Sequence, residues 1–159
     1  MIKFVSLALL LAVLSGCTSI AKVSNFETNA SQINFTQLAN LHNSTAKAGW
    51  TWQGKNEYFI NVKAIEKAEL SEKLINALDE HGYSLVKKSE DGSAIIGDKG
   101  IRLNEWWSVI GVYFSATNDG HQVYIKVELT QDITGGWTEN RAKSFAKYFC
   151  SQSKLCIDA

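Results

Sequence analysis

The sequence contains no proline, and this absence leaves glycine and asparagine to form its turns. It also lacks an excess of either charge, because 16 basic and 16 acidic residues give a formal net charge of zero. Such a balance offers no electrostatic reason to expect nucleic acid or an anionic lipid surface as a partner. Histidine is scarce, and none of the three histidines has a metal-ligand spacing to another histidine, a cysteine or a carboxylate. We therefore expect no nucleic acid partner, no metal site and no cofactor.

The longest hydrophobic run lies at the N-terminus, where residues 4–14 are almost entirely apolar and follow the positive charge of Lys3. This run is too short for a membrane-spanning helix, which needs about 20 apolar residues. A short basic region, an apolar stretch and small residues after it are typical of a secretory signal. The sequence therefore predicts a cleaved signal peptide over residues 1–16.

The signal ends in Leu14-Ser15-Gly16-Cys17, which resembles the lipobox of bacterial lipoproteins. In that family the signal is cut before the cysteine, whose thiol carries a diacylglycerol and whose new amine is acylated. The resemblance implies that Cys17 is lipidated and that its chains anchor the protein stably to a lipid bilayer. In the family an Asp after the cysteine commonly signals inner-membrane retention. The Thr18 found here therefore implies the outer membrane, facing the periplasm.

The other two cysteines, Cys150 and Cys156, lie close together near the C-terminus. An exported protein meets an oxidising compartment, in which such a pair forms a disulfide. Half of a metal site is the alternative, but no second pair of cysteines or histidines lies nearby in the sequence to complete it. We predict a disulfide between Cys150 and Cys156.

The chain that follows the signal divides into three parts. Residues 17–34 are rich in Ser, Thr, Asn, Lys and Ala, and we expect a flexible tether because they bury too little surface to offset chain ordering. Residues 35–54 are poorly patterned, with a short helix expected behind Asn34. Residues 55–159 show clear periodicities and are expected to form one globular domain.

Alternation of apolar and polar residues predicts a strand over 58–62, a hairpin over 83–98, and two long strands joined by Asn118-Asp119-Gly120. Helical spacing predicts one helix that ends at Gly82 and another that begins at the Gly135-Gly136 pair. The long strands are 106–117 and 122–132, and the apolar stripes of the helices are Leu70, Leu74, Ala77 and Leu78, and Ala142, Phe145, Ala146 and Phe149.

The alternation along 122–132 indicates that one face of the sheet is buried and the other is wet. Two helices with one apolar stripe each then pack on the buried face. The predicted fold class is α+β, with an antiparallel sheet of about four to six strands and two helices on one face. The element order over residues 56–150 resembles the helix-grip domains of some envelope lipoproteins, including the C component of the outer-membrane barrel-assembly machinery. That resemblance implies a non-catalytic role in the cell envelope.

An acidic residue, Glu105, precedes two adjacent aromatic residues, Trp106 and Trp107. This combination suggests a carbohydrate site, although a hydrolase would need a second carboxylate, for which Glu128 and Asp132 are available. The simpler interpretation is that one tryptophan lies in the core and the other is half-exposed, because neighbours in a strand face opposite sides.

The Gly135-Gly136 pair precedes the last helix, with Arg141 expected one turn inside it. Free amides at the start of a helix can bind an anion. The structural alternative is that the glycines make a sharp turn while Glu139 complements the helix dipole. We expect Trp137 to fold over the sheet edge as part of the core, and otherwise to be an exposed binding residue.

Two functions from different classes fit these observations. The first is a non-enzymatic lipoprotein that contacts another envelope protein or a cell-wall component. The second is a small periplasmic hydrolase that acts on glycan or peptide with Glu105 as its acid or base. An open sheet edge would favour the first function, because it can accept a strand from a partner. A carboxylate pair beside a tryptophan-lined cleft would favour the second.

Overall fold

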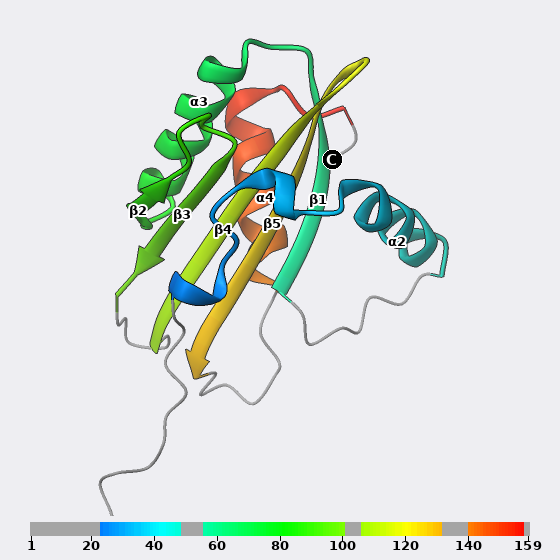
Figure 1. Ribbon diagram of the computed structural model, residues 1–159. Coiled ribbons are helices and arrows are strands. Elements are labelled where there is room, and N and C mark those ends of the chain that lie inside the picture. Colours follow the sequence, from blue (N-terminus) through cyan, green and yellow to red (C-terminus); the bar gives the residue numbers. More distant parts are fainter. Residues whose placement is uncertain (1–22, 49–55, 101–105, 132–139, 158–159) are drawn as a thin grey trace, which may run out of the picture.

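The structure, a computed structural model, describes residues 23–48, 56–100, 106–131 and 140–157. Its centre is a five-stranded antiparallel sheet with the strand order β1-β5-β4-β3-β2. Two helices cover one face of this sheet (Figure 1), so the predicted α+β fold is confirmed. The elements of this domain are β1 (Asn56–Lys63), α3 (Lys67–Glu80), β2 (Ser84–Lys88), β3 (Ala94–Lys99), β4 (Trp106–Thr117), β5 (Gly120–Gln131) and α4 (Arg141–Ser153).

The first of these helices, α3, forms where the apolar spacing predicts it. Its apolar stripe is buried, and the helix ends at His81 and Gly82. Gly82 has a φ of 88°, a left-handed conformation that suits glycine after a helix. The amide of Tyr83 then donates a 2.8 Å hydrogen bond to the Leu78 carbonyl, which closes the last turn. The cap predicted at Gly82 is therefore correct.

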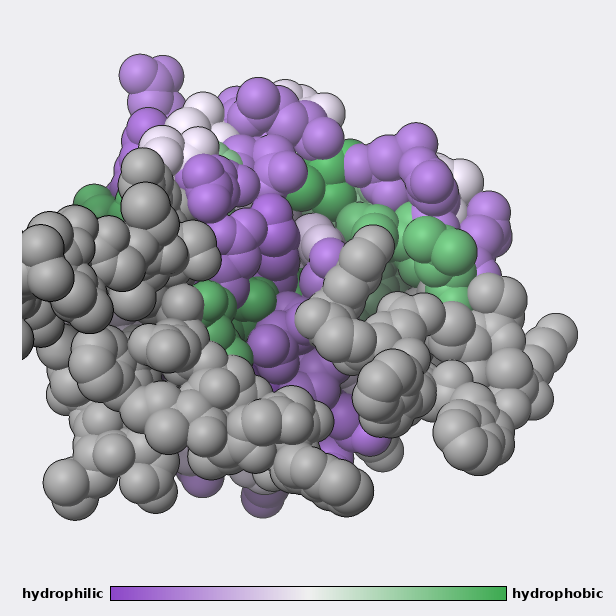
Figure 2. Space-filling view, turned by 90° about the horizontal axis from the view of Figure 1, so that it is seen from below, coloured by the Kyte–Doolittle hydropathy of each residue, from purple (hydrophilic) through white to green (hydrophobic). Residues whose placement is uncertain are grey.

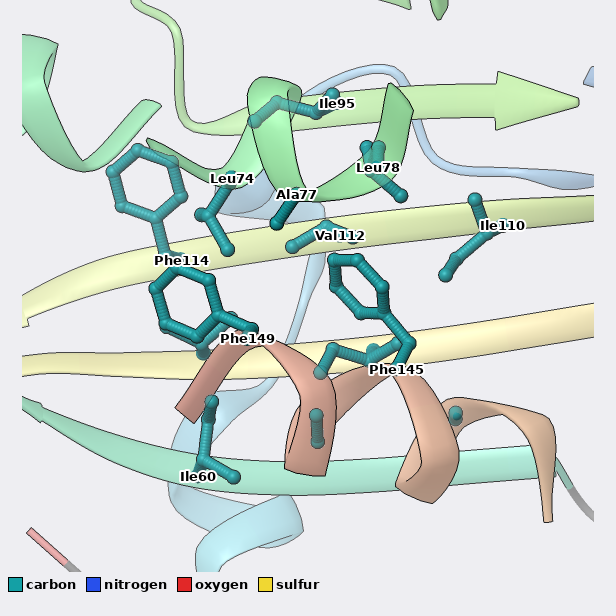
Figure 3. Close-up of a cluster of buried hydrophobic side chains, with 14 of the residues drawn as sticks. Ile60, Leu74, Ala77, Leu78, Ile95, Ile110, Val112, Phe114, Phe145 and Phe149 are labelled. Atoms are coloured by element: carbon teal, nitrogen blue, oxygen red, sulfur yellow. The ribbon is translucent and has the colours of Figure 1, made fainter. Parts of the chain in front are cut away.

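The main core lies between the sheet and the helices α3 and α4. Phe145 and Phe149 of α4 point towards the central strand β4, where Val112 and Phe114 are buried (Figure 3). Leu74 of α3 fills the neighbouring space. Fully burying large apolar side chains of this kind stabilises a fold by about 1.5–3 kcal/mol each, so this layer is the main source of the stability of the domain.

The opposite face of the sheet is also covered, and here the structure differs from the sequence prediction. Two short 3-10 helices, η1 (Val23–Asn25) and η2 (Ala30–Gln32), cross this face and lead into α2 (Phe35–Ala48). Phe26 and Ala30 are buried there, against side chains of β1, β3, β4 and β5. The prediction of one wet face is wrong, because Val109, Tyr113 and Tyr124 form a second apolar cluster with the N-terminal segment.

Residues 23–34, which we call the strap, were expected to be part of a flexible tether, and the structure corrects this expectation. A single ring, Phe26, fixes the strap because it lies directly over Gly111 of β4. A Cβ atom at Gly111 would lie 2.6 Å from Cδ1 of Phe26, so only glycine leaves room for the ring. Polar contacts add to this, because the Asn25 amide group donates a 3.1 Å hydrogen bond to Glu128. The short helix expected behind Asn34 is confirmed as α2.

Candidate functional site

The two edges of the sheet differ in how far they are covered. At the outer edge of β1, the Lys63 amide donates a 2.9 Å hydrogen bond to the Leu155 carbonyl. The Ile157 amide donates another, also of 2.9 Å, to the Asn61 carbonyl. The C-terminal tail therefore acts as a short extra strand on β1, and this edge is closed over that stretch.

The opposite edge, β2, pairs with no further strand among the residues that the structure describes. The strand pairs with β3 on one side and is the last strand of the described sheet on the other. All five of its residues are exposed, and they include the apolar side chains of Leu85 and Val86, which are 49% and 46% exposed. Two features of β2 disfavour pairing with strands of other molecules. One is a register shift between Leu85 and Lys87, and the other is the charge of Lys87 and Lys88.

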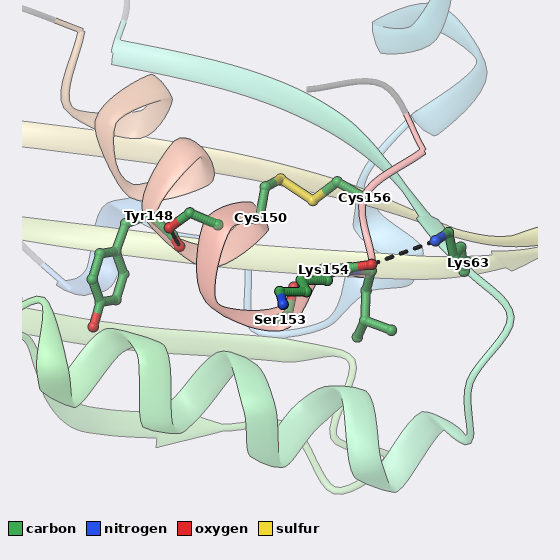
Figure 4. The surroundings of a disulfide bond; sticks show 8 residues. Lys63, Tyr148, Cys150, Ser153, Lys154 and Cys156 are labelled. Carbon is green, nitrogen blue, oxygen red and sulfur yellow. Dashed lines mark hydrogen bonds between the residues drawn. A yellow bond between two sulfur atoms is a disulfide. The ribbon is translucent and has the colours of Figure 1, made fainter.

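Cys150 and Cys156, the two cysteines predicted to pair, are joined by a disulfide in the structure, with their Cα atoms 5.3 Å apart (Figure 4). Cys150 is in the last part of α4, and Cys156 is in the tail that pairs with Val62 of β1. The Lys63 ammonium also donates a 3.5 Å hydrogen bond to the Lys154 carbonyl. The bond therefore holds the tail against the closed edge of the sheet.

Removing this disulfide in a Cys150→Ser, Cys156→Ser variant is expected to lower the free energy of unfolding by roughly 1–3 kcal/mol. The effect is small because the closed loop is short and constrains little entropy in the unfolded chain. Urea unfolding of the two proteins measures the difference. Hydrogen exchange provides the local readout, because the amides of Lys63 and Ile157 should lose protection first. Unchanged protection at both amides would contradict the role assigned to the bond.

Of the tryptophan and carboxylate residues proposed as a glycan site, the structure describes only part. Glu105 and Asp132 lie outside the described residues, and Trp106 begins β4 opposite Gln131. Trp107 is 39% exposed and has a φ of 21°, which is uncommon for a bulky residue. Glu128 forms a 3.2 Å ion pair with Lys126 and accepts the hydrogen bond from the strap. Its carboxylate therefore holds the strap, and no described contact joins it to Trp107.

The N-terminal end of α4 differs from the expectation for Arg141. The helix begins at Arg141, so this residue is its first residue rather than one turn inside it. Asn140 caps the helix, and its side chain accepts a 3.0 Å hydrogen bond from the Lys143 amide. The Arg141 amide donates a 2.9 Å hydrogen bond to the side chain of Asn56. Protein groups thus occupy two of the amides that an anion would use, while Gly135, Gly136 and Trp137 lie outside the described residues.

One polar cluster was not identified from the sequence. Asp91, in the turn between β2 and β3, accepts hydrogen bonds of 2.7 Å from the Lys67 ammonium and from the hydroxyl groups of Ser89 and Ser93. The hydrogen bond from Lys67 lowers the pKa of Asp91 most, and the two hydroxyl groups lower it further. The pKa of this carboxyl group therefore lies far below its usual value. The sequence signal was present in Ser89-Glu90-Asp91-Gly92-Ser93, because an Asp flanked by serines bonds its own turn.

This cluster borders a hollow of about 330 Å³ between the strap and the end of the sheet where β4 turns into β5. His121 also lines it, is 7% exposed, and has its Nε2 atom 2.8 Å from the Ile65 carbonyl. A backbone carbonyl therefore orients this imidazole, whereas a catalytic histidine is more often oriented by a carboxylate. The lysine and the serines around Asp91 serve the turn and its link to α3, so we assign the cluster a structural role.

Burial also changes the acid–base behaviour of two tyrosines beneath the strap. It raises the pKa of Tyr113 and of Tyr124 well above the usual value. The carboxylates of Glu27 and Glu57 add to the respective shifts. Both phenols are therefore neutral over the whole physiological range and behave as part of the apolar layer.

Within the ranges that the structure describes, no group of three or more His, Cys, Asp or Glu residues is arranged to hold a metal ion. In the same ranges, no helix has the length and apolar character needed to cross a membrane. No protein-family model matches this sequence, and no curated protein matches it.

Proposed function

We propose that this protein is a lipid-anchored envelope lipoprotein, held at the outer membrane through acylated Cys17 and facing the periplasm. Its globular domain acts as a non-catalytic module that contacts another envelope protein or a cell-wall component. The lipobox resemblance at Leu14-Ser15-Gly16-Cys17 supports the anchor. The open edge of the sheet supports the interaction role.

The observation on which the interaction role depends is the exposure of β2. Leu85 and Val86 are two of the five large hydrophobic side chains that are exposed in the described part of the chain. Unpaired backbone groups beside exposed apolar side chains are the features that an added strand uses, since the backbone provides affinity and the side chains provide specificity. A partner that supplies an extended segment would satisfy both.

The hydrolase alternative gains no supporting observation from the described residues. Glu128, one of the two carboxylates suggested to complement Glu105, is bound to Lys126 and to Asn25 of the strap. A general acid or base needs a carboxylate that can reach the substrate. The interaction role is therefore the function that the geometry supports best.

A Cys17→Ser substitution tests the anchor. We expect it to abolish labelling by a palmitate analogue in growing cells and to leave uncleaved precursor, because the thiol is the acceptor of the lipid. A Cys150→Ser, Cys156→Ser variant, which retains Cys17, is the control and should be labelled like the wild type. Labelling of the Cys17→Ser protein at the wild-type level would overturn the lipoprotein proposal.

In-cell photo-crosslinking tests the interaction role. A photoreactive amino acid at Val86, on the open edge, is expected to give a discrete product larger than the protein itself. The matched control is the same amino acid at Gln152, which is exposed on α4, and it should give no such product. The Val86 product should weaken strongly when Leu85 is changed to Lys, because a charge there disfavours an added strand. Equal products at Val86 and Gln152 would contradict a specific role for this edge.

A further inference from the structure

We propose that the β2 edge binds an extended, acidic segment of another protein, in which two adjacent carboxylates lie opposite Lys87 and Lys88. Apolar residues of the same segment then lie opposite Val86 and Leu85. This inference rests on the proposed function, because it concerns the same edge. It goes beyond that function in assigning the chemistry and the direction of the segment that binds there.

The backbone of the edge is directed outward at Lys88. The Ser89 amide donates a 2.9 Å hydrogen bond to the Ala94 carbonyl, so the backbone of Ser89 faces β3. In an antiparallel ladder the backbone groups of successive residues alternate between the two sides of the strand. The N–H and C=O groups of Lys88 therefore point away from β3, towards the position of an added strand.

The positive charge of this edge has no partner within the described part of the chain. Lys87 and Lys88 are exposed, and no ion pair or side-chain hydrogen bond between described residues involves either of them, including one to the nearby Glu90. At the other end of β2, Ser84 pairs with Asp98 of β3. The edge therefore presents two unpaired cations at one end, which an acidic segment would complement.

The two lysines lie on opposite faces of the sheet. Lys87 is opposite Ile96, which belongs to the cluster under the strap, and Lys88 is opposite Ile95, which is buried beneath the helices. Successive residues of an added strand also point to opposite faces. Two adjacent acidic residues can therefore each pair with one lysine, and opposite charges directly across a ladder stabilise the pairing whereas like charges destabilise it.

The apolar part of the edge determines the direction of the segment. Leu85 and Val86 are 49% and 46% exposed and precede the two lysines in the chain. All the described strand pairs of this sheet are antiparallel. A segment added in the same way has its acidic pair on the N-terminal side of its apolar residues. A second copy of β2 fits less well, because it would bring two further lysines to the same edge.

Selection by charge matters because the edge is short, at about 17 Å for its five residues. On the side of the domain that Figure 2 shows, hydrophilic side chains separate small apolar patches among the described residues. That described surface offers a partner no broad apolar contact. The lysines, which disfavour neutral and basic strands, then determine which segment is accepted.

The experiment uses the mature protein in detergent micelles and short synthetic peptides with the same flanking residues. Their centres are Glu-Glu-Val-Val, Gln-Gln-Val-Val or Lys-Lys-Val-Val. We expect the Glu peptide to bind at least about tenfold more tightly than the Lys peptide, with the Gln peptide between them. NMR titration measures the affinities, and the amide of Lys88 should shift more than that of Ser89, which is already bonded to β3.

The direction of the segment is tested by a peptide with the reversed centre, Val-Val-Glu-Glu. It has the same composition and charge as the Glu peptide, but antiparallel pairing would place its valines opposite the lysines. We expect it to bind several-fold more weakly than the Glu peptide. Equal affinity of these two peptides would overturn the assigned direction.

A Lys87→Glu, Lys88→Glu variant tests the two charges. It should reverse the order of the peptides, because each attraction becomes a repulsion and the Lys peptide now meets carboxylates. The matched control is Lys147→Glu, Lys154→Glu, which has the same net charge and changes exposed lysines outside β2. This control should keep the wild-type order, and thermal unfolding shows that both variants remain folded.

Equal affinities of the Glu, Gln and Lys peptides, or an order that Lys87→Glu, Lys88→Glu leaves unchanged, would overturn the proposal and leave strand addition at this edge intact. Failure of every peptide to shift the Lys88 amide would instead contradict strand addition itself, and with it the interaction role proposed above. Sedimentation without peptide is expected to show a monomer. A dimer that Leu85→Lys dissociates would make a second copy the occupant and would also overturn the proposal.

Discussion

Replacing Phe26 by alanine is expected to lower the free energy of unfolding by about 3–5 kcal/mol and to release the strap from the sheet. Phe26 is 3% exposed and its ring lies over Gly111, so the truncated side chain leaves a gap that the rigid sheet cannot close. Urea unfolding measures the loss. Hydrogen exchange shows where it occurs, since the amides of Gln32 and Ile33 should become the least protected, while those of α3 should fall by no more than the global loss.

The contact between Phe26 and Gly111 provides a matched control for this prediction. Gly111→Ala should cost about 1–3 kcal/mol, because the new methyl group would lie 2.6 Å from the Phe26 ring and 2.7 Å from the Tyr113 hydroxyl oxygen. Combined with Phe26→Ala it should cost at least about 0.5 kcal/mol less, since one of the two clashes is gone. Gly100→Ala, where no atom lies within 4 Å, should be nearly neutral. Strictly additive costs for the pair would show that the strap does not pack as described.

A Phe145→Ala substitution is expected to have a similarly large effect on the other face of the sheet. Phe145 is completely buried between α4 and the sheet, and its ring meets His81 edge-on at a centroid distance of 5.8 Å. Truncation of a phenylalanine in such a core costs about 3–5 kcal/mol, a large share of the about 5–15 kcal/mol that a domain has. This change should lower protection about equally throughout α3, α4 and the sheet, without the additional local loss that Phe26→Ala causes in the strap.

Lys147→Ala, two residues further along the same helix, is the control for Phe145→Ala. Its side chain is exposed, and substitutions at such positions usually change stability by no more than about 0.5 kcal/mol. Both proteins are compared with the wild type by thermal and urea unfolding. A midpoint for Phe145→Ala that matches that of Lys147→Ala would contradict the position of this ring in the core.

Coverage of both faces by different segments has a functional consequence. The helices cover one face and the strap covers part of the other, so among the described residues the β2 edge is an exposed surface that a partner can reach. Loss of Phe26 would therefore both weaken the domain and expose the second apolar face of the sheet.

The sequence by itself determined the local elements of this domain, because their signals lie within a few neighbouring residues. Alternation and the Asn118-Asp119-Gly120 turn predicted β4 and β5 to within two residues at each end. The helical spacing of the apolar residues from Leu70 to Leu78 predicted α3, and Gly82 predicted its C-terminal cap. The lipobox, on which the proposed anchor depends, is likewise a matter of sequence alone.

The strap was missed because its apolar residues follow no regular period. Its 3-10 turns and bends place Phe26 and Ala30 against the sheet without the spacing of a helix or the alternation of a strand. A signal was nevertheless present in β4, where Val109, Ile110, Val112, Tyr113 and Phe114 are apolar on both sides of the strand. A strand that is apolar on both sides is covered on both faces.

Only the tertiary structure decided which edge of the sheet is open and which segment covers its second face. The four strands from β2 to β5 lie in chain order because short connections place neighbours side by side. The place of β1 beside β5 depends on pairing between Asn56–Lys63 and residues more than fifty positions later. Contacts of such long range leave no mark in local periodicity, because they depend on the fit of whole surfaces. The exposure of the β2 edge and the packing of the strap through Phe26 both result from these long-range contacts.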